Sequence, residues 1–347
     1  MTIKLKPLNE QVIVLTGATS GIGLVTARMA AKRGAKLVLI ARNEEALKTL
    51  TWELIAAGGD AGYVPADVAN EAALDNAASE AIKEYGRIDT WINDAGVSIY
   101  GRLEDVAHED SRRLFETNFW GVVNGSLIAA KHLRTNGGAL INIGSTLSDR
   151  AIPIQGMYCA SKHAVKGFTD ALRMELEADG APISVTLIKP AAIDTPYRDH
   201  AKNYLGVQAQ NPPPVYSPET VADTILYCAE HQVRDVFVGA GGKLLSTMGE
   251  YAPRLTDMVM EKTMIDMQQT DEPLNINSKE GLYHSLDESL TERGGYSGHV
   301  SESSIYTKAS LHPLVAGAAL ALGVGTVIAM ANHFRSANGH SCAVGKT

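Results

Sequence analysis

Residues 12–23 read Val-Ile-Val-Leu-Thr-Gly-Ala-Thr-Ser-Gly-Ile-Gly, and this stretch decides the fold class. Its first four residues are apolar and mostly β-branched, which is typical of a buried parallel strand. The glycines follow at once, and a helical pattern then runs through Lys32. A glycine-rich turn between strand and helix lets the backbone approach a pyrophosphate, which binds at the helix N-terminus. The spacing differs from the Gly-x-Gly-x-x-Gly fingerprint, so a plain turn is the alternative interpretation.

The same alternation of strand and helix continues along the chain. Further strands are expected at 37–40, 61–64, 88–92, 139–143, 183–188 and 236–238. Helices are expected at 44–57, 71–85, 158–178 and 218–230, with two helical stretches around 105–134. This order predicts an α/β protein with a Rossmann-like, doubly wound parallel sheet of about seven strands and helices on both faces. Ligands of such sheets bind at the carboxyl ends of the strands, where the polar motifs of this chain fall.

Composition narrows the functional classes. The 347 residues carry a net charge of −8 and no cluster of Lys or Arg, which argues against nucleic acid as a partner. Three widely spaced cysteines, Cys159, Cys228 and Cys342, show no metal-ligand pattern, so we expect no metal site and a reducing compartment. The N-terminus has no long apolar stretch, so no signal peptide is expected and the catalytic part should be cytoplasmic.

Tyr158 and Lys162 lie four residues apart near the start of a predicted helix, so the phenol and the ammonium share one face. A free phenol titrates near pH ~10, and a nearby cation lowers that value, which makes the tyrosine a usable general acid or base. Ser145 follows the apolar run 139–143, so its hydroxyl is expected at the sheet edge, where it can bind a substrate oxygen. Taken alone, Tyr-x-x-x-Lys is also common as an ordinary helix pair.

Together these motifs resemble the short-chain dehydrogenase/reductase family, in its classical branch, over roughly residues 8–245. The matching pieces are 16–23, Asp67-Val68, Asn93-Asp-Ala-Gly96, Asn118, Ser145, Tyr158-x-x-x-Lys162 and 189–195, in the family's order. The family usually has a second asparagine where this chain has Asp94, and glycine where it has Ala191. We interpret both differences as tuning of the cofactor pocket.

The resemblance implies the roles of the site residues. Tyr158 would protonate a carbonyl oxygen or deprotonate an alcohol, and Ser145 would hold that oxygen, so these two would also bind the substrate. Lys162 would lower the pKa of Tyr158 and bind the nicotinamide ribose, and Asn118 would support a proton-relaying water. The residues implied in cofactor binding are Gly17, Thr19, Ser20, Gly21, Ile22, Gly23, Arg42, Asp67, Val68, Asn93, Ala95, Gly96, Tyr158, Lys162, Pro190, Ile193 and Thr195. A homodimer or homotetramer is implied as well.

The choice of cofactor can be predicted from the end of the second strand. NAD enzymes place a carboxylate there, about 20 residues past the glycines, to bind the ribose 2′-hydroxyl. This chain has Ile40-Ala41 followed by Arg42, whose guanidinium is suited to a 2′-phosphate. We therefore predict NADP(H), with a loop arginine in solvent as the alternative interpretation of Arg42.

The substrate is less defined by the sequence. Residues 196–216 occupy the family's variable substrate loop and contain Tyr197, Tyr204 and the run Asn211-Pro-Pro-Pro214. Loops of this length are often lids. A lipophilic ketone or aldehyde is expected, with acyl-chain, steroid-like, retinoid-like and quinone-like carbonyls all open. The alternative is a non-catalytic, membrane-tethered NADP-binding sensor or scaffold, which has no need of Ser145, Tyr158 and Lys162 together.

The composition changes beyond the domain expected at 1–245. Residues 246–267 are expected to form an amphipathic helix, with packing on the domain favoured over a membrane surface. Residues 268–312 are polar and are interpreted as an extended linker without a core. The uncharged run 314–331, within 313–332, is just long enough to span a membrane, and a buried helix is its alternative. The expectation is a cytoplasmic catalytic domain anchored by one C-terminal helix, with 333–347 as a short polar tail.

Overall fold

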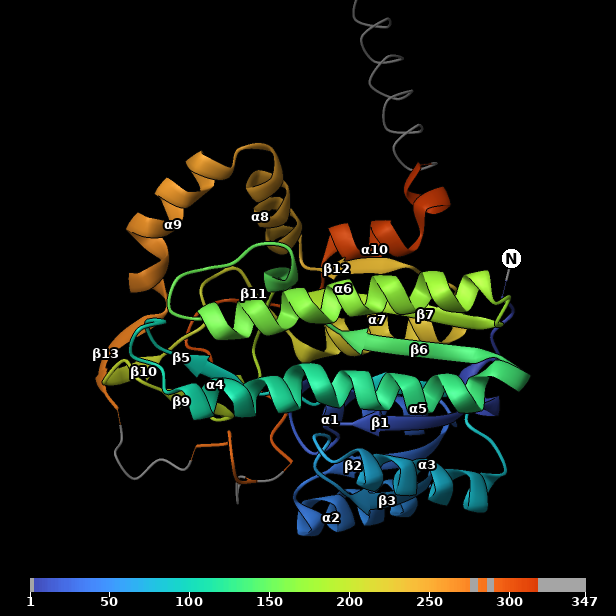
Figure 1. Ribbon diagram of the computed structural model, residues 1–347. Coiled ribbons are helices and arrows are strands. Elements are labelled where there is room, and N and C mark those ends of the chain that lie inside the picture. The colour runs from blue at the N-terminus through green and yellow to red at the C-terminus, as the bar shows by residue number, and fades with distance from the viewer. Residues whose placement is uncertain (1–2, 275–279, 286–289, 318–347) are drawn as a thin grey trace, which may run out of the picture.

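In the computed structural model, which describes residues 3–274, 280–285 and 290–317, the chain is built around a seven-stranded sheet (Figure 1). All its strand pairs are parallel, and the strand order is β12-β7-β6-β4-β1-β2-β3. The strands are β1 (Val12–Thr16), β2 (Lys36–Ala41), β3 (Asp60–Pro65), β4 (Thr90–Asn93), β6 (Gly138–Ile143), β7 (Ile183–Pro190) and β12 (Asp235–Val238). The predicted doubly wound α/β sheet is confirmed.

Helices cover both faces of the sheet, as Figure 1 shows. The apolar side chains of α1 (Gly21–Lys32), α2 (Glu44–Ala56) and α7 (Pro218–Glu230) pack on one face. Those of α3 (Glu71–Tyr85), α5 (Gly121–Asn136) and α6 (Gly156–Ala178) pack on the other. Strand β1 shows why, since Ile13 and Leu15 belong to the first core and Val14 to the second. Because successive strand residues point to opposite faces, a strand covered on both sides must be apolar throughout.

Local sequence signals set the ends of these helices. Asn43 and Asn70 precede α2 and α3, and their side chains accept hydrogen bonds from Ala46 N and Ala73 N. These bonds satisfy backbone donors that the first turn of a helix leaves unpaired. Helix α3 ends at Gly86, which adopts the left-handed conformation at φ 76°.

The predicted helical region at 105–134 is one continuous run with an irregular middle. Helix α4 (His108–Phe115) passes through a π-helical turn (Glu116–Trp120) into α5. A π turn widens the helix by one residue and is frequent at functional sites. Here it contains Asn118, which is fully buried.

The sheet order creates a crevice beside β1. Strand β1 pairs with β2 on one side and β4 on the other, so the connections leave in opposite directions at this point. The connection after β1 leads to β2 and the connection after β4 leads toward β6, and the crevice lies at the carboxyl ends of the strands at this point, where α/β proteins bind ligands.

The predicted substrate loop at 196–216 is tied down by short strands. It contains the 3-10 turn Pro196–Arg198 and the strands β9 (Ala201–Asn203), β10 (Val207–Ala209) and β11 (Val215–Tyr216). Strand β9 pairs with β5 (Ser98–Tyr100), and β11 pairs with β8 (Ala192–Ile193). The segment is therefore a wall with its own backbone pairing.

The amphipathic segment expected at 246–267 forms two helices, α8 (Ala240–Tyr251) and α9 (Pro253–Met267), arching beside the domain (Figure 1). The break falls at Pro253, which has no N–H to continue a helix. Leu245, Met260 and Met264 pack against Ile152 and Cys159, so one side of the arch is joined to the domain. The expected boundary at 245 falls inside α8.

The structure differs from the linker expected at 268–312. Strand β13 (Gln269–Pro273) pairs with β10, β14 (Val300–Ser301) pairs with β11, and α10 (Ile305–Leu311) lies against β12 (Figure 1). Leu282 is fully buried in a cluster with Tyr158. The low apolar content was misleading because the segment is held by backbone pairing and a few separate apolar anchors.

Most of the membrane helix predicted at 314–331, and the tail 333–347, lie outside the described residues. Within residues 3–274, 280–285 and 290–317, we find no helix long and apolar enough to cross a membrane. Membrane association through 314–331 stays a prediction.

The packing of Leu282 can be tested by Leu282→Ala. Because the side chain is 0% exposed, its truncation leaves a cavity, and we expect the free energy of unfolding to fall by about 2–4 kcal/mol in urea titrations. Leu244→Ala is the matched control, since Leu244 is 61% exposed and should change stability by less than about 0.5 kcal/mol. Equal effects of the two substitutions would contradict a packed C-terminal segment.

Candidate active site

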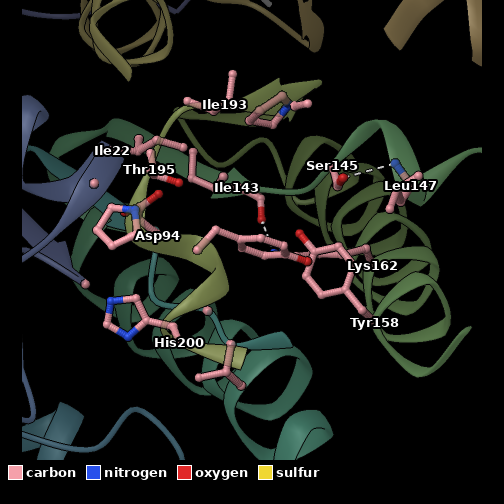
Figure 2. Close-up of a pocket in the computed structure, with 18 of the residues that line it drawn as sticks. Ile22, Asp94, Ile143, Ser145, Leu147, Tyr158, Lys162, Ile193, Thr195 and His200 are labelled. Atoms are coloured by element: carbon pink, nitrogen blue, oxygen red, sulfur yellow. Dashed lines mark hydrogen bonds between the residues drawn. The ribbon is translucent and has the colours of Figure 1, made fainter. Parts of the chain in front are cut away.

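A cavity of about 340 Å³ lies at the carboxyl ends of the strands, at the crevice beside β1. Figure 2 shows Ile22, Asp94 and Thr195 at one side of it and Ser145, Tyr158 and Lys162 at the other. Most of the predicted site residues line this cavity: Gly17, Thr19, Ser20, Gly21, Ile22, Arg42, Asp67, Val68, Ala95, Gly96, Ser145, Tyr158, Lys162, Pro190, Ile193 and Thr195. Residues from distant parts of the chain thus meet in one place.

The glycine-rich turn after β1 is shaped by close backbone contacts. Gly17 has φ +74°, and a Cβ there would lie 2.9 Å from the backbone of Ala95. A Cβ at Gly23 would lie 2.1 Å from the carbonyl oxygen of Gly17, so α1 can begin here only with glycine. Gly23 thus lies behind the cavity wall and lets the turn pass close to α1.

Two neighbours complete this turn. Ser20 precedes α1, and its Oγ lies 3.1 Å from Nε2 of His200. Burial and the charge of Arg42 lower the pKa of His200 to about 4, so the imidazole is neutral. From the C-terminal segment, Thr291 accepts a hydrogen bond from Gly21 N and Leu290 donates one to the carbonyl of Thr19.

Helix α6 places Tyr158 and Lys162 one turn apart, and both side chains reach the cavity (Figure 2). Lys162 Nζ donates to the carbonyl of Ile143 at 2.8 Å and lies 5.7 Å from the centre of the Tyr158 ring. Ser145 follows β6, and its Oγ accepts from Leu147 N at 3.0 Å. The end of β6 therefore positions both the lysine and the serine.

Burial dominates the proton chemistry of this group. It raises the pKa of Tyr158 to about 12, against hydrogen bonds from Ser145 and Tyr197 that lower it. It lowers the pKa of Lys162 to about 8, although Asp94 raises that value. Ser145 and Tyr197 are thus the groups that oppose the effect of burial on the phenol, while Lys162 bonds to Ile143.

Asp94 puts a carboxyl group into the site. Burial raises its pKa to about 7, while Lys162 and the Gly23 N–H lower it. The carboxyl lies where Figure 2 shows Ile22 and Thr195, on the side of the cavity opposite Ser145. It therefore changes charge near neutral pH inside a cavity that also holds Lys162.

Two predicted residues, Asn118 and Asn93, lie behind the cavity wall. Asn118 Oδ1 accepts from Val97 N at 2.8 Å, and its Nδ2 donates to Val97 O at 2.9 Å and Ser161 Oγ at 3.2 Å. Asn93 was expected to line the ribose, but its Nδ2 donates to Asn142 Oδ1 at 2.8 Å inside the sheet. As the last residue of β4, Asn93 points to the face covered by α5, where its Nδ2 also donates to Ser126 Oγ at 3.1 Å.

Arg42 lies at the other end of the cavity. Its guanidinium donates to the carbonyls of Gly281, at 2.6 Å, and Leu282, at 3.4 Å. Arg113 also donates to Leu282 O and forms an ion pair with Asp67 at 2.5 Å. Burial, with the nearby charge of Arg113, lowers the pKa of Arg42. Two guanidinium groups thus converge, and the carboxylate of Asp67 beside them is paired with Arg113.

The remaining wall is mainly apolar. It includes Leu147, Ile152 and Pro212–Pro214, with Leu245 and Met264 from the helical arch. Sequence analysis missed several lining residues because they come from segments without a motif, namely Gln155, His200, Met264 and Ser285.

The cavity fits a nicotinamide dinucleotide. The glycine turn leaves space at the start of a helix that side chains would fill, as an anion site requires. Arg42 provides a cationic group at one end, and Tyr158 and Ser145 provide hydroxyls at the other.

Comparisons with known proteins agree with this architecture. The profile of the family described as short chain dehydrogenase matches residues 11–204. The chain is 49% identical over 322 residues to an uncharacterized oxidoreductase of Bacillus subtilis, YxnA, covering 92% of this chain and 90% of the relative. It is 37% identical over 241 residues to the Bos taurus dehydrogenase/reductase SDR family member 7B, covering 66% and 73%. A 3beta-hydroxysteroid dehydrogenase of Mediterraneibacter gnavus is 30% identical over 253 residues, covering 66% and 91%.

One solved structure supports the fold. The alcohol dehydrogenase from Thermococcus sibiricus, complexed with 5-hydroxy-NADP, aligns with a TM-score of 0.59 at 24% identity. The alignment covers 66% of this chain and 95% of that chain.

Asp94→Asn tests the charge of the buried carboxyl. Its pKa rises from 3.8 to about 7 on folding, so ionisation lowers the free energy of unfolding as pH rises through this window. The variant lacks this loss, so the difference between its free energy of unfolding and that of wild type should grow by about 3 kcal/mol between about pH 4 and pH 7. Urea unfolding across this range measures the difference, with the exposed Asp75→Asn as control. A difference that stays constant with pH would contradict the prediction.

Proposed function

The chain belongs to the short-chain dehydrogenase family, and from this premise we propose that it is an NADP(H)-dependent oxidoreductase acting on an apolar carbonyl or secondary alcohol. The observation that carries the proposal is one cavity with Arg42 at one end and Ser145, Tyr158 and Lys162 at the other. A bound nicotinamide supplies or accepts the hydride. The protein supplies orientation and proton transfer.

The residues act on the substrate oxygen. In reduction, the Tyr158 hydroxyl donates its proton to that oxygen, and in oxidation the phenolate removes the alcohol proton. Ser145 holds the same oxygen, since its side chain lines the cavity on the same side as Tyr158. Lys162, held by Ile143 O, keeps a positive charge beside the phenol ring. Asn118 holds the backbone of Val97 beside this group. The proposal includes a second role for Asn118, the support of a water that relays protons.

Arg42 supports the choice of NADP(H). The end of β2 has no carboxylate to repel a 2′-phosphate, and Arg42 lines the cavity there. Its donors are oriented by the carbonyls of Gly281 and Leu282, which hold the guanidinium plane without neutralising its charge. Asp67 is paired with Arg113, so it does not cancel Arg42 directly.

The apolar wall supports a lipophilic substrate. Leu147, Ile152, Leu245 and Met264 surround the space beside Tyr158 and Ser145 without adding charge. Two of the similar proteins are named as a 3beta-hydroxysteroid dehydrogenase and an alcohol dehydrogenase. Both names agree with a substrate that carries a carbonyl or alcohol group beside Tyr158.

Tyr158→Phe tests the proposed reaction. We expect oxidation of NADPH by a panel of cyclohexanone, acetophenone and decanal to fall by roughly 100- to 10,000-fold, the range for loss of a general acid. Binding of NADPH, followed by its fluorescence, should stay within about threefold because the ring is retained. The control is Tyr85→Phe, whose hydroxyl bonds Asp60 on the surface. Full turnover by Tyr158→Phe would refute the mechanism, and a wild type that binds NADPH without turnover would favour the sensor.

Arg42→Ala tests the cofactor. We expect the Kd for NADPH to rise by roughly 10- to 100-fold, because charge-assisted bonds to the 2′-phosphate are lost. The Kd for NADH should change by less than about threefold, since NADH lacks that phosphate. Arg33→Ala is the control, as Arg33 pairs with Asp223 on the surface. Equal weakening of both cofactors, or equal use of NADH by the wild type, would overturn the assignment.

A further inference from the structure

Tyr197 lies against the catalytic tyrosine. It comes from the 3-10 turn Pro196–Arg198, directly after Thr195, and lines the same cavity. The rings of Tyr197 and Tyr158 pack edge to face with centroids 5.5 Å apart at 74°. Tyr197 also lowers the pKa of Tyr158, against the effect of burial. The mechanism above makes no use of Tyr197.

The Tyr197 hydroxyl is held by a network of buried side chains. Its oxygen lies 2.7 Å from Ser98 Oγ and 2.9 Å from Gln155 Oε1. Gln155 Nε2 donates to Gln268 Oε1 at 2.6 Å. Gln268 is fully buried, and its Nε2 donates to Pro153 O at 3.1 Å and Met264 O at 2.9 Å. The orientation of the Gln155 amide is thereby set, with its oxygen toward Tyr197.

The Tyr197 proton has more than one acceptor within reach, since Ser98 Oγ and Gln155 Oε1 both lie at hydrogen-bond distance from the Tyr197 oxygen. A phenol has one O–H and can also accept hydrogen bonds. While Tyr158 is protonated, Tyr197 can donate to Gln155 Oε1. When Tyr158 becomes a phenolate, the proton of Tyr197 can turn to it, and Ser98 can donate to the oxygen of Tyr197. The charged acceptor is favoured, because hydrogen bonds to ionised groups are the stronger ones.

We propose that Tyr197 is a further residue of the active site, whose hydroxyl donates a hydrogen bond to the Tyr158 phenolate and stabilises it during proton transfer. The inference rests on the proposed role of Tyr158. The proton that Tyr158 gives up goes to the substrate oxygen, and Tyr197 keeps its own proton throughout. Tyr197 is thus a positioning and stabilising group, and Gln155 holds its hydroxyl ready between turnovers.

Other groups around Tyr158 are engaged differently. Lys162 donates to Ile143 O, and the Cys159 thiol lies against Ile152 O. The remaining titratable neighbours of Tyr158 are Asp94, after β4, and Tyr100, on β5. Among the described residues, the Tyr100 hydroxyl is buried without a hydrogen-bond partner. Its ring packs on Tyr197 with centroids 6.2 Å apart. Tyr100 is therefore a buried tyrosine in the same cluster without the proposed function, and it provides the matched control.

The test is Tyr197→Phe in the full chain, which keeps the ring and removes the hydroxyl. The titration of Tyr158 is followed by NMR of ¹³Cζ-labelled tyrosine with NADP⁺ bound, and Tyr158→Phe assigns the signal. We expect the apparent pKa of Tyr158 to rise by roughly one unit, because the phenolate loses a charge-assisted donor. Tyr100→Phe should leave this pKa within about 0.3 units, since it removes an unpartnered hydroxyl.

A second variant gives a shift of opposite sign. Gln155→Met removes the competing acceptor, so Tyr197 donates to Tyr158 more readily and the pKa of Tyr158 should fall. If the network has only a structural role, the pKa of Tyr158 should shift in the same direction in both variants, or in neither. No shift in Tyr197→Phe, or an equal shift in Tyr100→Phe, overturns the proposal.

Kinetics separate this proposal from the proposed function. For any carbonyl of the panel that turns over, kcat/KM is measured against pH. In Tyr197→Phe the pKa of its alkaline limb should rise by the same amount as the pKa of Tyr158 in the NMR titration, and the KM for NADPH should stay unchanged. If the wild type reduces none of the panel, the proposed activity fails, while the NMR titration still decides the role of Tyr197.

Discussion

The close approach of the turn after β1 to the loop after β4 is the constraint on which the site depends. A Cβ at Gly17 would collide with the backbone of Ala95, and one at Gly23 with the carbonyl of Gly17. Without these contacts, α1 could not begin at the edge of the crevice, and the loop at Asp94 could not lie beside Lys162. The parallel order then adds the ends of β6 and β7 to the same edge, since all strands point one way.

Burial then sets the chemistry of the side chains gathered there. The phenol of Tyr158, the ammonium of Lys162 and the carboxyl of Asp94 are all shifted toward their neutral forms, because a low-polarity cavity penalises charge. Each charged state therefore needs partners. Ser145 and Tyr197 lower the pKa of the Tyr158 phenol, and the Ile143 carbonyl accepts a hydrogen bond from Lys162. Each charged state at the site is thus stabilised by neighbouring groups. We therefore expect a single substitution to change several pKa values together.

The sequence predicted this sheet and most of the cavity lining because their signals are local. An apolar run followed by glycines, as at Gly17, indicates both a strand and its carboxyl end. A serine directly after a strand, as at Ser145, marks the same end of the sheet, where ligands bind. The side chain of Asn93 does not line the cavity, because membership of a motif does not reveal which face of a strand a side chain takes; that depends on register. Tyr197 was visible only as a loop residue, since its importance arises from contacts with Gln155 and Tyr158 across the fold.

The C-terminal segment shows most clearly what composition cannot reveal. It is polar, yet Leu282 enters the cluster of Tyr158, the Gly281 carbonyl holds Arg42, and Thr291 bonds the glycine turn. Gln268 fixes the amide of Gln155. These contacts use backbone groups or single side chains, which leave no periodic pattern in the sequence. Because these contacts reach both Arg42 and the cluster of Tyr158, the segment lies against both ends of one cavity. A polar composition therefore does not show that a segment is an extended linker.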